Sequence, residues 1–165
     1  MGRVRFVLHL PVSAKYLMQY LARRYKLPVS ESNEMIGEVI KVGIAAMICF
    51  KEIRQVGHSV CVVSKEGRIL GPLIFDLRRL ALEKKNEFFA VSFESSAETA
   101  AIIYEIAETF KLVNPEGADN KDMAVALSLQ ILEKWDEELR RGNRICVADE
   151  KNNVIEELRL PIPSS

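Results

Sequence analysis

Residues 56–69 read VGHSVCVVSKEGRI, and residues 141–154 read RGNRICVADEKNNV. When Gly57 is aligned with Gly142, these stretches also match Cys61 with Cys146 and Ile69 with Val154. The same shift along the chain, from residue 57 to residue 142, also aligns YKL at residues 25–27 with FKL at residues 110–112. We call this shift the repeat offset. Because two separate stretches share one offset, the sequence predicts a tandem duplication of a single folding unit. The alignment slips by a residue or more between the helices, which predicts a loop of changed length there.

The first copy opens with a short amphipathic strand and a helix. Residues 5–10 alternate between an apolar and a polar face, with Phe6, Leu8 and Leu10 against Arg5, Val7 and His9. Such alternation is typical of a half-buried strand. Pro11 ends the strand because proline cannot donate a hydrogen bond to a sheet. Ser13 then suits the N-cap of a helix that extends to about residue 25.

A longer helix and a hairpin complete the unit. A second helix is predicted from about residue 33 to residue 56, with an inward stripe of Ile36, Val39, Ile40, Gly43, Ile44, Met47 and Phe50. Gly57 predicts a left-handed helix cap. Gly67 predicts the tight turn between strands at residues 60–63 and 68–70.

The second copy repeats this order. A strand is predicted at residues 89–93, followed by a helix that a capping box of Ser95 and Glu98 opens. Asp119 is the predicted cap of the next helix. The second hairpin has Asn152 in place of the turn glycine, and asparagine also tolerates a left-handed backbone.

The expected fold class is mainly α with short β-strands, an α+β protein in which each copy is strand-helix-helix-hairpin. The expected domains are a first unit at residues 1–75, a helical linker at residues 76–87 and a second, acidic unit at residues 88–165. A strand beside its own helices needs a partner strand. The copies are therefore expected to form an intramolecular pseudo-dimer, the alternative being a strand from another chain. The hairpins are expected to pack on Phe50 and Trp135 or to pair between copies.

Composition and motifs argue against several classes of function. No apolar run approaches the roughly 20 residues of a membrane span, and no signal peptide is expected at the N-terminus. The three cysteines are scattered, which indicates reduced thiols and a cytoplasmic location. Without a phosphate-binding glycine loop, G-x-S-x-G or H-E-x-x-H, we expect no enzyme, catalytic residue, cofactor or small-molecule substrate. The acidic residues Glu133, Asp136, Glu137 and Glu138 are interpreted as a helix flank without a metal, because no histidine is nearby.

The two halves carry opposite charge. Residues 1–85 contain 15 Lys and Arg against 7 Asp and Glu, whereas residues 86–165 contain 8 against 16. The net charges are therefore +8 and −8, although the whole chain is neutral. A basic half is typical of a surface that binds nucleic acid. Opposite charges equally favour association of the two copies, within one chain or between chains.

The order of these elements resembles the ribbon-helix-helix family of DNA-binding regulators. The features that carry the resemblance are a strand ending in Leu-Pro, a capped helix, the sequence VSE at residues 29–31 and a second apolar helix. The resemblance covers residues 3–56 and residues 88–141. In that family two strands pair into an antiparallel ribbon whose outward side chains read the DNA major groove. The resemblance implies a transcriptional or plasmid-type regulator that binds double-stranded DNA and self-associates, with no membrane partner.

The resemblance also implies the site. Arg5, Val7 and His9 would face the base edges, and Arg3 and Lys15, near the strand ends, would contact phosphates.

The second copy offers Ala90, Ser92 and Glu94 at its outward positions, and a carboxylate opposes phosphate and at best accepts from a cytosine amine. Strand alternation alone gives another interpretation, in which Arg5 and His9 are solvated residues of a half-buried strand. The protein would then be a non-DNA-binding interaction or scaffold protein that keeps the fold as a dimerisation device.

Overall fold

The computed structural model of the chain describes residues 3–27, 32–73, 88–109 and 120–160. They form β1 (Arg3–Pro11), α1 (Val12–Arg24), α2 (Ser32–Gln55), β2 (Ser59–Val63), β3 (Ile69–Pro72), β4 (Phe88–Ser96), α4 (Ala97–Thr109), α5 (Asn120–Arg140), β5 (Arg144–Ala148) and β6 (Val154–Glu157). The described chain is therefore a mixed α+β fold with four helices and two antiparallel sheets, which confirms the expected class at that level.

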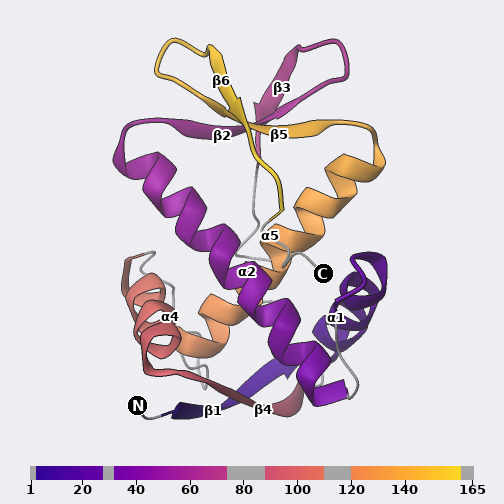
Figure 1. Ribbon diagram of the computed structural model, residues 1–165, viewed down its shortest axis with the longest axis vertical. Helices are drawn as coiled ribbons and strands as arrows, with labels where there is room; N and C mark the ends of the chain where they lie inside the picture. Colours follow the sequence, from indigo (N-terminus) through magenta and orange to yellow (C-terminus); the bar gives the residue numbers. More distant parts are fainter. Residues whose placement is uncertain (1–2, 28–31, 74–87, 110–119, 161–165) are drawn as a thin grey trace.

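The two sheets lie at opposite ends of the helices (Figure 1). β1 pairs with β4 in a two-stranded ribbon, and the other sheet has the order β3-β2-β5-β6. α2 and α5 cross between the two sheets, and α1 and α4 lie on either side of them (Figure 1). The predicted partner of the first strand is confirmed, because β1 pairs with β4 of the same chain. The hairpins also pair with each other, through β2 and β5.

Each described strand and helix of the first half has a counterpart at the repeat offset. β1 and β4 begin at residues 3 and 88, α1 and α4 at residues 12 and 97, and β2 and β5 at residues 59 and 144. α2 and α5 end at residues 55 and 140. α1 and α4 end at residues 24 and 109, and α5 begins three residues later than α2 in this alignment, at residue 120 against residue 32. The connection between the helices is therefore longer in the second half, as predicted, although α2 and α5 end in the same register.

Residues at equivalent positions lie against each other from the ribbon, through the helix crossing, to the four-stranded sheet. The pairs, each separated by the repeat offset, are Val7 with Ser92, Gly43 with Ser128, Phe50 with Trp135, and Cys61 with Cys146. Phe50 and Trp135 stack with ring centroids 5.7 Å apart and are both buried. The two halves therefore meet through the same positions of each.

One hydrophobic core joins the predicted units at residues 1–75 and 88–165. Leu8 and Leu10, on the inner face of β1, are fully buried within it. Gly43 allows the close approach of α2 to α5, because a Cβ there would lie 2.9 Å from Ser128 Oγ and 3.2 Å from its backbone carbonyl carbon. The ribbon thus rests on a core that both halves build.

The predicted left-handed positions are confirmed. Gly57 and Gly67 have φ of +82° and +86°, and Asn152 has φ of +63°. These residues end α2 and close the two hairpin turns, where a positive φ reverses the chain.

Two predicted helix caps are wrong by a residue or two. β4 stays paired with β1 as far as Ser96, so α4 starts later and its cap is Ser96 rather than Ser95. Ser96 Oγ accepts a hydrogen bond from the Thr99 backbone N–H at 3.1 Å. α1 begins at Val12, which places Ser13 within the first turn instead of before it.

Two predicted features fall on residues that the structure does not describe, and two further findings concern the described helices and cysteines. The predicted linker at residues 76–87 and the predicted cap Asp119 lie outside the described residues. Among the described helices, none is long and apolar enough to cross a membrane. Cys49, Cys61 and Cys146 are all free thiols.

Candidate nucleic-acid interface

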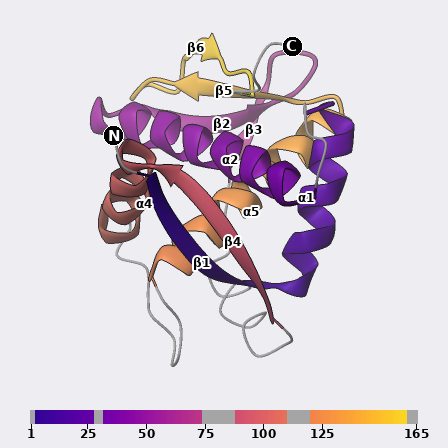
Figure 2. The same ribbon diagram turned by 60° about the horizontal axis from the view of Figure 1, so that its bottom comes forward.

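The β1–β4 ribbon is the candidate interface, and it runs across one end of the molecule (Figure 2). Its strands are nine residues each and pair antiparallel from Arg3 with Ser96 to Pro11 with Phe88. Successive side chains of a strand point to opposite faces. The inner positions Leu8 and Leu10 pack on the helices, so the alternate positions form an outward face.

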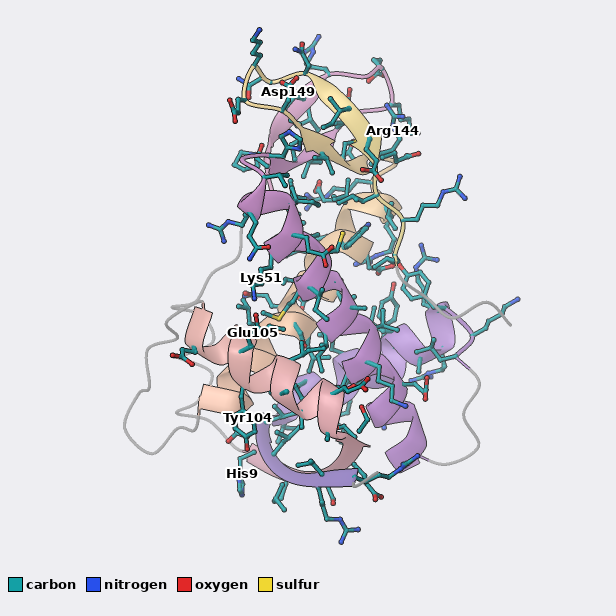
Figure 3. All side chains as sticks on the ribbon, turned by 60° about the vertical axis from the view of Figure 1, so that its left-hand side comes forward. His9, Lys51, Tyr104, Glu105, Arg144 and Asp149 are labelled. Carbon is teal, nitrogen blue, oxygen red and sulfur yellow. The ribbon has the colours of Figure 1, made fainter. Side chains whose placement is uncertain are left out.

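The outward positions whose side chains the structure describes are all exposed: Arg3, Arg5, Val7 and His9 on β1, and Ala90, Ser92, Glu94 and Ser96 on β4. Val7 is 52% exposed although it lies next to fully buried Leu8. The His9 side chain, labelled at the ribbon end of Figure 3, is 62% exposed. The three predicted base-contact residues, Arg5, Val7 and His9, therefore share one accessible surface.

The register decides which side chains are neighbours across the ribbon. Arg5 is paired with Glu94, and His9 is paired with Ala90. The first pair sets a five-donor guanidinium beside a carboxylate acceptor, whereas the second sets an imidazole beside a methyl group. The two ends of the outward face thus differ in charge and in hydrogen-bonding capacity.

The predicted phosphate contacts lie at opposite ends of the ribbon. Arg3 opens β1, and Lys15 is in the first turns of α1, directly after β1 ends; both are exposed. Glu98, in the first turn of α4, is an exposed acid at the Arg3 end. Cations therefore flank the outward face at both ends, and among the described residues the exposed acid Glu98 lies at the Arg3 end.

A buried carboxylate anchors the strand at His9. The His9 backbone N–H donates to Asp122 Oδ1 at 3.2 Å, and His9 Nδ1 lies 3.9 Å from Asp122 Oδ2. Asp122 is 4% exposed and sits in the first turn of α5, where the helix dipole favours a negative charge. The sequence analysis missed this residue, because an aspartate near a helix start gives no sign of a distant backbone partner.

A second buried carboxylate joins α1 to α5. Asp136 is 1% exposed and accepts hydrogen bonds from Tyr20 Oη at 2.9 Å and Arg24 Nε at 2.7 Å, and also from Tyr25 Oη. Arg140 Nε, from α5 itself, lies 3.1 Å from Asp136 Oδ2. Asp136 lies on a flank of α5, as interpreted, but α1 and the residue that follows it cover this flank with three donors.

Those donors also set the ionisation of the cluster. Burial acts to raise the pKa of Asp136, but the hydrogen bonds from Tyr25, Arg24 and Tyr20 outweigh it and lower the pKa below its ordinary value. The pKa of Tyr25 is raised, first by burial and then by its hydrogen bond to Asp136. The carboxylate therefore stays charged as the acceptor of this helix–helix contact.

The equivalent contact in the other half has different chemistry. Lys51 of α2 forms an ion pair with Glu105 of α4, and the two side chains lie side by side in Figure 3. At the repeat offset, Lys51 aligns with Asp136, and Tyr20 aligns with Glu105. A comparison of charge at aligned positions is the signal by which the sequence could have pointed to both contacts.

The described residues hold no group of three or more His, Cys, Asp or Glu side chains that could bind a metal ion.

A scan against protein-family models found no family that matches this chain. A search of the curated proteins found no match. A search of the solved structures also found none. The function is therefore inferred from the chain's own residues.

Proposed function

We propose that this protein is a DNA-binding regulator, built as a tandem ribbon-helix-helix pseudo-dimer, that inserts the β1–β4 ribbon into the major groove. The observation that carries the proposal is the outward face of the ribbon, where eight alternate positions are exposed while the inner Leu8 and Leu10 are fully buried. The inner face of the ribbon packs on the core, and its outward face is exposed.

The shape of the ribbon supports the proposal. The major groove of B-DNA is about 12 Å wide and admits a two-stranded β-ribbon. Nine paired residues with side chains perpendicular to the sheet match that mode of entry. The contacts between equivalent positions support the pseudo-dimer, because in a two-fold arrangement the residues on the axis meet their own counterparts.

Charge supports the proposal at the ribbon itself. Arg3, Arg5 and Lys15 are exposed there on the first half, which carries the net charge of +8. Phosphate contacts by such cations supply most of the sequence-independent affinity for DNA. The face has only one acid on its eight described positions, Glu94.

The test is the salt dependence of binding to duplex DNA of mixed sequence. We expect binding at low salt that weakens steeply as salt rises, because each phosphate contact releases counterions. Replacing Arg3 and Lys15 with Gln should reduce the slope of log affinity against log salt by about 2, or about 1 per contact.

Arg68→Gln and Lys65→Gln provide the matched control, since they remove the same charge from the hairpin at the far end of the molecule. Absence of binding at low salt would overturn the proposal and favour an interaction or scaffold protein. An equal loss of slope in the control would show that net charge, rather than the ribbon, attracts DNA.

A further inference from the structure

The two strands of the ribbon present different side chains at equivalent positions. When the two halves are aligned at the repeat offset, Arg5 corresponds to Ala90, Val7 to Ser92, and His9 to Glu94. These are equivalent positions of the two strands and not the partners in the strand register. All six are exposed, so none of these differences is needed to fill the core. A dimer of identical subunits presents two identical halves to DNA, and its site is correspondingly palindromic. This ribbon presents two unlike halves.

The groups that support and flank the ribbon differ in the same way. Asp122, which holds the His9 backbone, aligns with Gly37, which has no side chain to do so. Lys15 aligns with Ala100, so the exposed cation that follows β1 has no counterpart at the aligned position after β4. The asymmetry therefore extends beyond the outward face to its anchor and its flanks.

The chemistry of the Arg5 end indicates which base pair it reads. An arginine donates to guanine O6 and N7, and a carboxylate accepts from the cytosine amine. Arg5 and Glu94 are register partners on neighbouring strands, so donor and acceptor lie side by side at this end. They suit the two edges of a G·C pair or of adjacent G·C pairs.

The chemistry of the His9 end is different. Ala90 offers only a methyl group, which suits contact with the methyl group of thymine. His9 lies across from it and adds a hydrogen-bonding ring, and the carboxylate near that ring, Asp122, is buried behind the strand and not exposed on the outward face. This end suits a base pair that carries thymine.

We infer that the ribbon reads an asymmetric, non-palindromic duplex site, with G·C at the end of Arg5 and Glu94 and a thymine-bearing pair at the end of Ala90. This inference rests on the proposed function. It adds that the chain has one preferred orientation on DNA, which a symmetric dimer does not have.

Selection of duplexes from a random library by the whole chain tests the inference. We expect an asymmetric motif. Direct titrations should then show about tenfold or greater preference for that motif over either of two palindromes, each made by repeating one of its halves.

A variant with matched strands sharpens the test. Ala90→Arg, Ser92→Val and Glu94→His together give β4 the same outward residues as positions 5, 7 and 9 of β1. Because all three replaced residues are exposed, the melting temperature should be unchanged. The variant should now select a palindrome with guanine in each half, because arginine then stands at the same position of both strands.

The outcomes separate the inference from the function beneath it. A palindromic motif selected by the parent chain would overturn the asymmetry and leave DNA binding intact. Equal binding to every duplex would overturn base reading by the ribbon. No binding to any duplex would overturn the proposed function itself, and the inference with it. The result for the parent chain stands even if the variant does not fold.

Discussion

Lys51 and Asp136 occupy the same position of the two long helices, each four residues before the helix ends, and carry opposite charges. Each bonds to the first helix of the other half: Lys51 to Glu105 of α4, and Asp136 to Arg24 of α1. The two contacts are thus equivalent in place and reversed in sign.

This reversal favours pairing of unlike halves. If two first halves paired with each other, Lys51 of one would meet Tyr20 and Arg24 of the other, and no acid is present at these aligned positions. Two second halves would bring Asp136 against Glu105, an acid against an acid. Repulsion in the unwanted pairings is a common source of specificity between related partners. The charges therefore favour the pairing of first half with second half that β1 and β4 make within one chain.

The first prediction tests the ion pair between Lys51 and Glu105. Lys51→Glu should lower the free energy of unfolding by about 0.5–1 kcal/mol, because it sets two carboxylates together at a partly exposed site. Adding Glu105→Lys should restore the loss. Urea unfolding of both single variants and the double variant measures the coupling. Additive losses would show that the two side chains do not interact.

The second prediction concerns Asp136. Asp136→Asn should lower the free energy of unfolding by about 1–3 kcal/mol, because a neutral amide cannot accept from all of the donors around this buried site. Glu137→Gln is the matched control on the next residue, whose ion pair with Arg141 is near the surface. That variant should cost at most about 0.5 kcal/mol. Equal losses in urea unfolding would contradict a special role for Asp136.

The third prediction is the pH dependence of the same contact. The pKa of Asp136 is lowered in the folded protein, whereas an unfolded aspartate has a pKa of about 3.9. Its contribution to stability is therefore complete above that value and is lost as pH falls through the folded-state pKa. The difference in unfolding free energy between the parent and Asp136→Asn should shrink below about pH 4. A difference that stays constant down to about pH 2 would assign the contribution to shape rather than charge.

Several features of the fold show where prediction from the sequence succeeds. The strand faces, the pairing of β1 with β4 and the turn at Asn152 follow from alternation, the repeat and backbone preference. Each depends on local pattern, or on the fact that two copies of one unit share a fold. The outward placement of Arg5 and His9 follows from the same alternation.

Asp136 and Asp122 show where prediction fails. The run EKWDEEL at residues 133–139 contains several acids, and only the position of α1 decides which of them is covered. The partner of Asp122 is a backbone N–H in another element, which no side-chain pattern reveals. The start of α4 likewise depends on how far β1 pairs with β4. Each depends on tertiary packing that a single local stretch does not encode.

The fourth prediction concerns the helix crossing. Gly43→Ala gains about 1 kcal/mol of helix propensity, but its Cβ would lie 2.9 Å from Ser128 Oγ. Overpacking of this kind typically costs about 1–3 kcal/mol, so we expect a net loss of stability. Adding Ser128→Gly removes the colliding side chain and should make the double variant more stable than the sum of the single effects. A Gly43→Ala variant that melts at or above the parent temperature would contradict this close approach.

The last prediction separates base reading from phosphate contact on the ribbon. Arg5→Ala should cost about 1–3 kcal/mol on the preferred DNA site and reduce discrimination between sites, because a base-edge contact is lost. Lys15→Ala should weaken binding to all sequences alike and lower the salt slope by about 1. Glu94→Ala should leave binding to mixed DNA unchanged or strengthen it, because it removes a carboxylate that opposes phosphate. Titrations of each variant against the selected site and a scrambled duplex measure both effects. If Arg5→Ala with His9→Ala binds every duplex as the parent does, the outward face of β1 is a solvated surface and does not read DNA.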